Sequence, residues 1–365
     1  MIDFSPTVEQ EEIRQLARSL ASDRLRPEGR SAERRGDISA ELMRMLAQTG
    51  LTTPFSEDLG GSGPLEAVTY VLIAEELGFG DGGLAMNIFG SMLGPLAVAL
   101  AGNERQLEQY IYPFCDAQEG AKERGSLAIA ERTGGYSVAE ISTALRRDSD
   151  YYLINGTKRA VIHGAQSCPR VVLARLADTT GKDGLCAVIL PAQAEGLQIT
   201  PDGQKLGLLA APSASYALKD VIVTPDALLG EPGNAGVLRV AALSALLRAG
   251  VACGMVRAAL EYAGHYAEER IAFGRPIVSY QGIAFLLAEM AMKLDAAHLL
   301  LWQAAAEWDR VPAPETLLRD AEAAQYQAVK LAKAATIDAV QIMGGAGFMQ
   351  DHPVEMWMRN AAAME

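Results

Sequence analysis

The sequence predicts an α+β protein of three domains: a helical domain over residues 1–124, a β-domain over 125–232 and a four-helix bundle over 233–365. Three observations support this. The chain has 365 residues, more than one hydrophobic core usually serves. Half of the residues are apolar, which is enough to build a large core. Helical spacing of apolar residues fills the first and last thirds, whereas short β-rich runs fill the middle.

The first domain opens with a clear helical pattern. Ile13, Leu16, Ala17 and Leu20 recur at the spacing of one helix face. The preceding Ser5-Pro6 pair predicts the start of this helix, because serine is a good N-cap and proline suits the first helical position.

The middle third consists of short apolar runs bounded by turn residues, at 151–154, 171–174, 186–190 and 221–223. Asn155-Gly156 directly follows the first run, and this dipeptide is typical of a β-hairpin turn. We therefore expect a hairpin there, within a small barrel or sandwich.

The last third predicts long helices joined by short breaks, which is typical of a bundle. One helix face is marked by Leu286, Leu287, Met290, Leu294, Ala297 and Leu301. Pro312 and Pro314 break this pattern, a further helix is expected over residues 322–340, and Gly344-Gly345 ends it.

The composition excludes several classes of function. The formal net charge of −13 disfavours binding to nucleic acid and to anionic membranes. The four cysteines and four histidines are dispersed, so no metal site is predicted. The N-terminus has no signal-peptide pattern, and we expect no apolar run of membrane-spanning length. These features favour a cytoplasmic protein with reduced thiols.

Two stretches carry candidate ligand-binding residues. In ERIAFGRPI, residues 269–277, Arg270 and Arg275 flank Phe273, a set suited to a phosphate beside a planar ring. The alternative is a helix corner with solvated charges. Glycines in QIMGGAG, residues 341–347, allow close approach of a ligand, although a helix C-cap also explains them. No strand precedes this turn, so it is not a dinucleotide fingerprint of the Rossmann type.

Taken together, these stretches resemble the C-terminal domain of acyl-CoA dehydrogenases. The resemblance extends to YYLINGTK and KLGLLAAPSASYALKDVIVTPDALLG in the middle, and to LTTPFSEDLGGSGPLEAVTYVLIAEELG near the start. It covers essentially the whole chain. It implies the three-domain fold of that family, bound FAD, an acyl-CoA substrate and an electron-transfer flavoprotein or similar acceptor.

The resemblance also implies which residues contact FAD. Arg270 would bind the pyrophosphate of the FAD in a neighbouring subunit, with Phe273, Gln281, Gln341, Gly344 and Gly345 close to the same cofactor. The isoalloxazine ring would lie against the β-domain, beside Ile129, Ala130, Gly135, Ala160, Val161 and Ile162. A homodimer or homotetramer is implied, since one chain would complete the cofactor site of another.

The chain departs from the family pattern at two of these places. Relatives carry a T-E-P-x-x-G-S turn, whereas residues 130–137 read AERTGGYS, in which Glu131 and Gly135 match and Ser137 is displaced by one. Relatives carry W-I-T or W-I-S beside the flavin, and here the run is Ala160-Val161-Ile162. The hydroxyl that would bond flavin N5 is replaced by Ile162, so the electronic tuning of the flavin must differ.

No catalytic residue is predicted. The family uses a glutamate to remove the α-proton, in most relatives within an E-G-T motif soon after the segment that matches residues 359–361. The sequence stops at Glu365 before such a motif, and we expect the catalytic segment to lie beyond it. Other relatives place the base on the first bundle helix, where residues 243–246 hold no carboxylate. The alternatives are a catalytically silent subunit that binds FAD or acyl-CoA, and a flavin oxidase or monooxygenase on the same fold.

Overall fold

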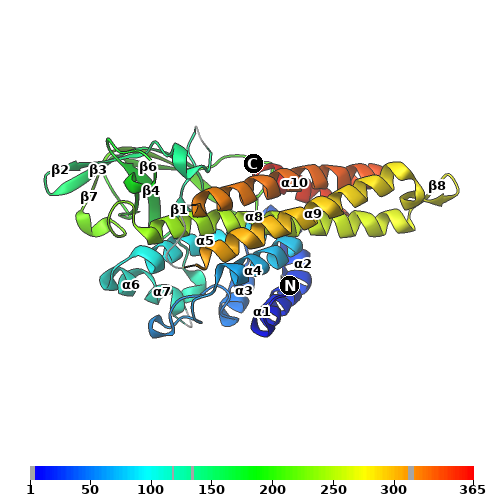
Figure 1. Ribbon diagram of the computed structural model, residues 1–365, viewed down its shortest axis with the longest axis horizontal. Coiled ribbons are helices and arrows are strands. Elements are labelled where there is room, and N and C mark those ends of the chain that lie inside the picture. Colours follow the sequence, from blue (N-terminus) through cyan, green and yellow to red (C-terminus); the bar gives the residue numbers. More distant parts are fainter. Residues whose placement is uncertain (1–4, 117–118, 133–134, 311–315) are drawn as a thin grey trace.

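The computed structural model describes residues 5–116, 119–132, 135–310 and 316–365, and its elements are arranged as a sheet at one end of a long helical body (Figure 1). The expected helical, β and helical segments follow one another along the chain. Pro312, Pro314 and residues 133–134 of the AERTGGYS turn lie outside the described residues. The first segment forms helices α1 Val8–Leu20, α2 Arg26–Arg35, α3 Ala40–Gln48, α4 Ala67–Gly80, α5 Gly82–Ala101, α6 Glu104–Tyr110 and α7 Tyr112–Cys115.

The first helix begins later than the Ser5-Pro6 pair predicts. Thr7 is the N-cap of α1, and its hydroxyl accepts a hydrogen bond from the Gln10 backbone N–H at 3.2 Å. The Gln10 side chain in turn accepts from the Thr7 backbone N–H at 3.0 Å. This reciprocal pair satisfies two backbone donors that a Ser5 cap would leave open, so the start predicted at Ser5 was wrong.

The middle segment forms one mixed sheet of seven strands. Its strands are β1 Ser126–Ala128, β2 Ala144–Asp148, β3 Tyr151–Ile162, β4 Arg170–Leu176, β5 Leu185–Leu190, β6 Leu197–Pro201 and β7 Ser213–Val223. The main order is β1-β4-β2-β3-β7-β6, and β5 pairs with β4. The β-domain predicted from the short apolar runs is thus confirmed.

The hairpin expected at Asn155-Gly156 was wrong. Asp148 pairs with Tyr151, so the turn lies at residues 149–150, and β3 continues through Asn155 and Gly156. The register with β7 shifts between Ile154 and Gly156, as in a β-bulge. A Cβ at Gly156 would lie 2.5 Å from the Thr143 hydroxyl, so the glycine serves close packing inside the sheet instead of a turn.

Four helices make the C-terminal bundle: α8 Ala235–Glu269, α9 Gln281–Trp308, α10 Leu317–Met343 and α11 Val354–Ala362. The predicted apolar face of α9 is confirmed at Met290, Leu294, Ala297 and Leu301, which are all buried. Between α8 and α9, strands β8 Ile271–Ala272 and β9 Arg275–Pro276 form a small hairpin. This hairpin projects at the end of the molecule opposite the sheet (Figure 1).

Helix α8 is the centre of the fold and packs against α4, α5, α9 and α10. Its approach to α4 depends on glycine on both sides. A Cβ at Gly78 would lie 2.4 Å from the Val251 carbonyl oxygen, and one at Gly254 would lie 2.2 Å from the Glu75 carbonyl oxygen. Any side chain at either position would force the two helices apart.

Two helices are long and apolar enough to cross a membrane by length and composition, namely α5 and α8. The expectation that no apolar run reaches that length was therefore wrong. In α5, 78% of the most apolar window is buried inside the fold, and in α8 this share is 89%. Such burial is what core helices of a large domain show, because their apolar side chains contact protein on all sides.

Candidate functional site

The main candidate site is a cavity of about 880 Å³ between the sheet and the C-terminal helices. We call it the large cavity. Ala130, Gly135, Ala160 and Ile162 all line it, so four of the predicted flavin-contact residues lie together. On the other side it is bounded by the loop that precedes β7 and by α11, with Leu208 and Met358 among the lining residues.

The two other predicted residues of the sheet face elsewhere. Val161 is only 2% exposed and packs into the sheet's own hydrophobic core, so its side chain does not reach the large cavity. Ile129 lines a separate cavity of about 40 Å³, which also includes Ala160 and Ile162. We call this the small cavity.

Strained backbone forms part of the wall of the large cavity. Ala160 and Leu208 both have positive φ, at 52°, which is uncommon for residues other than glycine. Leu208 is held there by α11, since its backbone N–H donates to Asn360 Oδ1 at 2.7 Å. A shape that costs energy and is fixed by tertiary contacts is typical of a binding site.

The end of β3 is anchored to α5 through His163. Its Nε2 donates to the backbone carbonyl and to Oδ1 of Asn87, both at 3.1 Å. Burial lowers the pKa of His163 to about 4, so the ring is neutral near pH 7. Just before it, Ile162 packs so closely on α5 that a Cβ at Gly90 would lie 2.5 Å from Ile162 Cγ2. The aliphatic residue is therefore accommodated by a glycine on the facing helix.

A buried ion pair holds the loop that carries Ala130 and Gly135. Glu131 Oε1 lies 2.8 Å from Lys158 Nζ, and both side chains are almost fully buried. The carboxylate also accepts from the backbone N–H and hydroxyl groups of Ser142 and Thr143. Burial alone would raise the pKa of Glu131, but Lys158 and these donors lower it to about 2. Glu131 is thus a permanent acceptor that fixes the loop.

Cations are gathered around the large cavity. Arg159 is exposed and makes no ion pair within the described part of the chain. Lys205 Nζ donates to the carbonyls of Leu208 at 3.1 Å and Ala211 at 2.6 Å, and burial lowers its pKa. Arg359 is neutralised by Glu33 and Glu355. Of these three cations, Arg159 and Lys205 remain as positive charge for an anionic ligand, and Arg248 also lines the cavity.

The small cavity lies between α5, α8 and the edge of the sheet. Its walls are mostly apolar, with Met86, Phe89 and Leu93 from α5 and Leu247 from α8. Two polar side chains, Ser244 and Arg248, interrupt them on the α8 side. Arg248 and Tyr136 also line the large cavity, so these two residues stand where the cavities meet.

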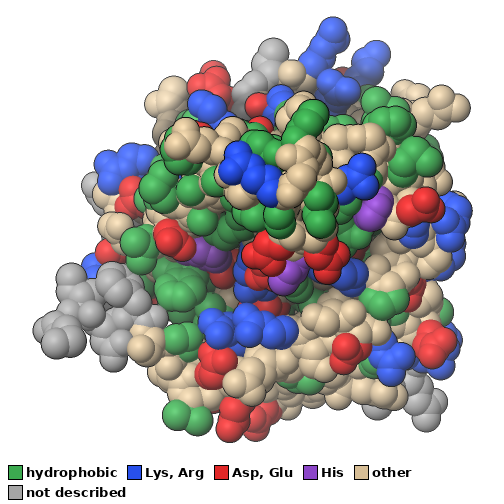
Figure 2. All heavy atoms as spheres, turned by 90° about the vertical axis from the view of Figure 1, so that its right-hand side faces the viewer, with side chains coloured by type: hydrophobic (Ala, Val, Ile, Leu, Met, Phe, Trp, Pro, Cys, Tyr) green, Lys and Arg blue, Asp and Glu red, His purple; other side chains and the backbone are tan. Residues whose placement is uncertain are grey.

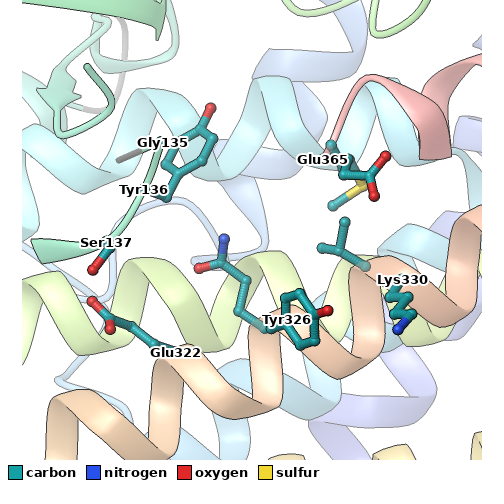
Figure 3. A pocket seen from close by; sticks show the side chains of 10 residues that line it. Gly135, Tyr136, Ser137, Glu322, Tyr326, Lys330 and Glu365 are labelled. Atoms are coloured by element: carbon teal, nitrogen blue, oxygen red, sulfur yellow. The ribbon is translucent and has the colours of Figure 1, made fainter. Parts of the chain in front are cut away.

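A third cavity, of about 370 Å³, lies between the loop of residues 135–137 and α10. Figure 3 shows the Ser137 side chain beside Glu322, with Tyr326 further along α10 and Glu365 at the far side. Glu322 accepts a hydrogen bond from the Val138 N–H at 2.8 Å, and burial raises its pKa. Glu365 pairs with Lys333. Both carboxylates are thus engaged, and neither is assigned as a catalytic base.

The remaining predicted residues are absent from the lining of all three cavities. Arg270, Phe273, Gln281, Gln341, Gly344 and Gly345 are exposed, and Phe273 is 97% exposed. The first three belong to the hairpin segment and the start of α9. Figure 2 looks onto this end of the molecule, where hydrophobic and basic side chains lie side by side. One chain alone therefore does not bring the two predicted groups of FAD contacts together.

The structure brings together three possible metal ligands that are dispersed in the sequence. The ligand atoms of Glu75, Cys253 and His298 lie within 4.8 Å of one another. Glu75 Oε1 already accepts hydrogen bonds from His298 Nδ1 at 2.8 Å and Trp302 Nε1 at 3.1 Å. The carboxylate is thus satisfied by protein donors that join α4 to α9, and we assign this cluster a structural role.

Four residues that line the cavities were not predicted from the sequence, namely Tyr136, Lys205, Arg248 and Glu322. Arg248 had a detectable signal, because it is the one charged residue between Val240 and Val256 in the sequence. Tyr136 stands in the turn that departs from the family pattern. Lys205 and Glu322 had no such signal, since their roles depend on contacts with distant loops.

Comparison with known proteins matches the chain over almost its full length. Models described as the N-terminal, middle and C-terminal domains of acyl-CoA dehydrogenase match residues 7–118, 126–221 and 235–365. The mitochondrial short-chain specific acyl-CoA dehydrogenase of Bos taurus is 30% identical over 359 residues, which cover 97% of this chain and 85% of that protein. The short-chain specific acyl-CoA dehydrogenase of Clostridium acetobutylicum is 29% identical, with 100% and 95% covered.

Solved structures agree. Butyryl-CoA dehydrogenase from Megasphaera elsdenii superposes with a TM-score of 0.83 at 28% identity, covering 100% of this chain and 95% of that one. The glutaryl-coenzyme A dehydrogenase in its glutaryl-CoA complex gives 0.85 at 25% identity, with 100% and 92% covered. A chain from the structure of the electron transferring flavoprotein of Acidaminococcus fermentans gives 0.83 at 28% identity, with 100% and 94% covered.

Proposed function

Because the chain belongs to the acyl-CoA dehydrogenase family, we propose that it is an FAD-dependent oxidoreductase that desaturates an acyl-CoA thioester between carbons α and β. The observation that carries the proposal is the large cavity. Ala130, Gly135, Ala160 and Ile162 come from two segments about 30 residues apart, and they line one volume of about 880 Å³.

The residues around this cavity fit a flavin. Ala160, Ile162 and Leu208 offer apolar surface to a planar ring, and Arg159 and Lys205 supply positive charge for phosphate. When bound there, FAD supplies the hydride acceptor of the family's reaction. The chain's own residues shape the site, since Glu131 fixes one wall and Asn360 fixes the opposite one.

The proposed active form is a homodimer or homotetramer. Arg270, Phe273, Gln341, Gly344 and Gly345 are exposed and do not line the cavities of their own chain, so we assign them to the FAD of a neighbouring copy. Exposed apolar side chains on α9, Phe285 and Met292, supply surface for such contact. Closed symmetry would let each copy complete the other's site.

The proposed electron acceptor is an electron-transfer flavoprotein. The support is the similarity to a chain in the structure of such a flavoprotein from Acidaminococcus fermentans. The net charge of −13 would favour an acceptor with a basic docking surface.

A second candidate function is a silent subunit that binds FAD and acyl-CoA without turnover. The observation in its favour is that no carboxylate among the described residues lines the small cavity. A general base must reach the substrate proton directly or through one water.

Anaerobic titration separates the two candidates. Protein purified with FAD should show the absorption bands of oxidised flavin, and these should bleach when a substrate acyl-CoA is added. Bound flavin that acyl-CoA perturbs but never bleaches, across chain lengths from C4 to C16, would favour the silent subunit. Failure to bind FAD in a calorimetric titration would contradict both.

A further inference from the structure

Helix α8 carries an arginine in a place where charge is costly. Arg248 is only 5% exposed, and the residues on either side of it in the helix are apolar. No carboxylate lies within ion-pair distance of it in the described part of the chain. A buried cation without a counterion is unfavourable, so a carboxylate from outside the chain would be strongly attracted to this position.

The Arg248 guanidinium has an N–H donor that makes no hydrogen bond within the described part of the chain. Arg248 Nη2 donates to the Met364 carbonyl at 2.5 Å, and its Cζ lies over the Tyr136 ring, 3.7 Å from the ring centroid. Its Nε is buried and has no hydrogen-bond partner. Guanidinium offers five N–H donors in a planar fork that matches a carboxylate. The stacking and the carbonyl fix this fork at the point where the large and small cavities meet.

The volume of the small cavity limits the size of the ligand group that can bind to the Arg248 guanidinium. A cavity of about 150 Å³ accommodates benzene, so the roughly 40 Å³ here accommodates about two non-hydrogen atoms. The α5 wall, with Met86, Phe89 and Leu93, offers no polar group. The Ser244 hydroxyl stands one helical turn before Arg248 on the same face of α8. Polar recognition is thus confined to one wall of a very short pocket.

We propose that Arg248 determines substrate specificity by binding a carboxylate at the far end of a short acyl group, so that the preferred substrate is a dicarboxylic monothioester of four or five carbons. This inference rests on the proposed function, because it places the thioester end of the acyl group in the large cavity beside the flavin and only its far end at the small cavity. Ser244 assists as a second hydrogen-bond donor. A long saturated acyl chain would not fit into the small cavity. It would also leave the positive charge of Arg248 without a partner.

The test compares ligands of equal carbon number on the FAD-loaded protein. Calorimetric dissociation constants are measured for glutaryl-CoA against valeryl-CoA, and for succinyl-CoA against butyryl-CoA. We expect the carboxylated ligand to bind at least tenfold more tightly in each pair. Arg248→Met should abolish this preference, and Arg248→Lys should keep part of it, since lysine retains the charge without the fork.

Arg239→Met is the matched control. Arg239 lies on the same helix, stacks over Trp308 at 3.7 Å and donates to the Trp308 carbonyl at 2.9 Å, but it does not line the small or the large cavity. Its loss should leave the ratio of dissociation constants unchanged. If Arg248→Met and Arg239→Met alter both ligands of a pair equally, the role of Arg248 is structural and the inference is overturned.

Two further outcomes are distinguishable. Wild-type protein with bound FAD that prefers the neutral ligand would overturn the carboxylate assignment and leave the proposed function intact. The same holds if Arg248→Met shifts the flavin spectrum or reduction potential but not the ligand ratio, because Arg248 would then serve the flavin. Protein that binds FAD but none of the four thioesters would overturn this inference, and titration with longer acyl-CoA up to C16 would then decide the proposed function separately.

Discussion

Replacement of Glu131 by glutamine tests whether the buried ion pair holds the wall of the flavin site. In the native protein Lys158 Nζ lies 2.8 Å from Glu131 Oε1 and donates also to the Ile129 carbonyl at 3.1 Å. Glutamine keeps the shape of the side chain but removes the negative charge. Lys158, whose side chain is 0% exposed, would then be a buried cation without a counterion.

The expected loss is about 3–5 kcal/mol of unfolding free energy, the range for breaking a buried ion pair by removing one partner. Lys158→Met should cost a comparable amount, because it leaves the carboxylate unpaired. The double variant should cost clearly less than the sum, since neither charge is then left alone in the interior. The exposed pair Lys122–Glu119 is the control, and Glu119→Gln should change stability by less than about 1 kcal/mol.

The pH dependence of the unfolding free energy tests the same ion pair independently. The pKa of Glu131 is lowered in the folded protein to about 2, below its ordinary value of 4.5. The unfolded chain therefore binds the proton more readily, so this stabilisation is complete above about pH 4.5 and is lost as the pH falls toward 2. In Lys158→Met the ammonium no longer lowers the pKa of folded Glu131, so the difference from the unfolded chain narrows and stability should fall less between pH 4.5 and 3.

Urea unfolding of the native protein, the two single variants, the double variant and the Glu119→Gln control between pH 3 and 7 measures both effects. Calorimetric FAD binding should follow the same order, because Ala130 and Gly135 flank Glu131 and line the large cavity. Equal stability of Glu131→Gln and native protein at pH 7 would refute the reasoning. So would strictly additive losses in the double variant, since the two charges would then not be coupled.

Three other outcomes are expected. Gly90→Ala should destabilise the protein by about 1–3 kcal/mol in thermal unfolding, because its Cβ would lie 2.5 Å from Ile162 Cγ2. Adding Ile162→Ala should recover most of this loss. An unchanged melting temperature of Gly90→Ala would contradict the close packing of α5 on Ile162. Arg270→Ala should weaken FAD binding more than tenfold in calorimetry without lowering stability, since the side chain is exposed; unchanged affinity removes it from the cofactor site. Phe285→Glu on α9 should lower the mass measured by light scattering. Val8→Glu should not, although Val8 is also apolar and exposed, because Val8 lies on α1.

The long helices were predictable because their apolar positions repeat over many turns. The buried face of α9 is an example, with Met290, Leu294 and Leu301. Because these residues repeat at helical spacing, each one indicates that the others lie on the same face. Local signals that compete were not resolved in the same way. Ser5-Pro6 predicts a helix start at Ser5, whereas the hydrogen bonds of the structure show that Thr7 is the N-cap and that Gln10 completes the capping box.

The candidate site was predictable only in part, for a related reason. Ala130, Gly135, Ala160 and Ile162 were found through their positions in family motifs, which fix the backbone path. Which way a side chain points was not accessible, and Val161 turned out to face the sheet core. The register shift between Lys158 and Val161 and the positive φ of Ala160 alter the simple alternation of a strand, and neither can be derived from residues 158–162 alone.

Arg248 shows how far a single residue can be interpreted before and after the fold is known. In the sequence it is a lone charge within an apolar stretch of α8, and such a residue can reach solvent, pair with another chain segment or face a ligand. The structure removes the first option, since the side chain is 5% exposed, and it meets the second only through the Met364 carbonyl and the Tyr136 ring, neither of which carries a negative charge. The third remains, with Nε unpaired and the side chain at the junction of two cavities. The charge is thus best explained by what binds beside it.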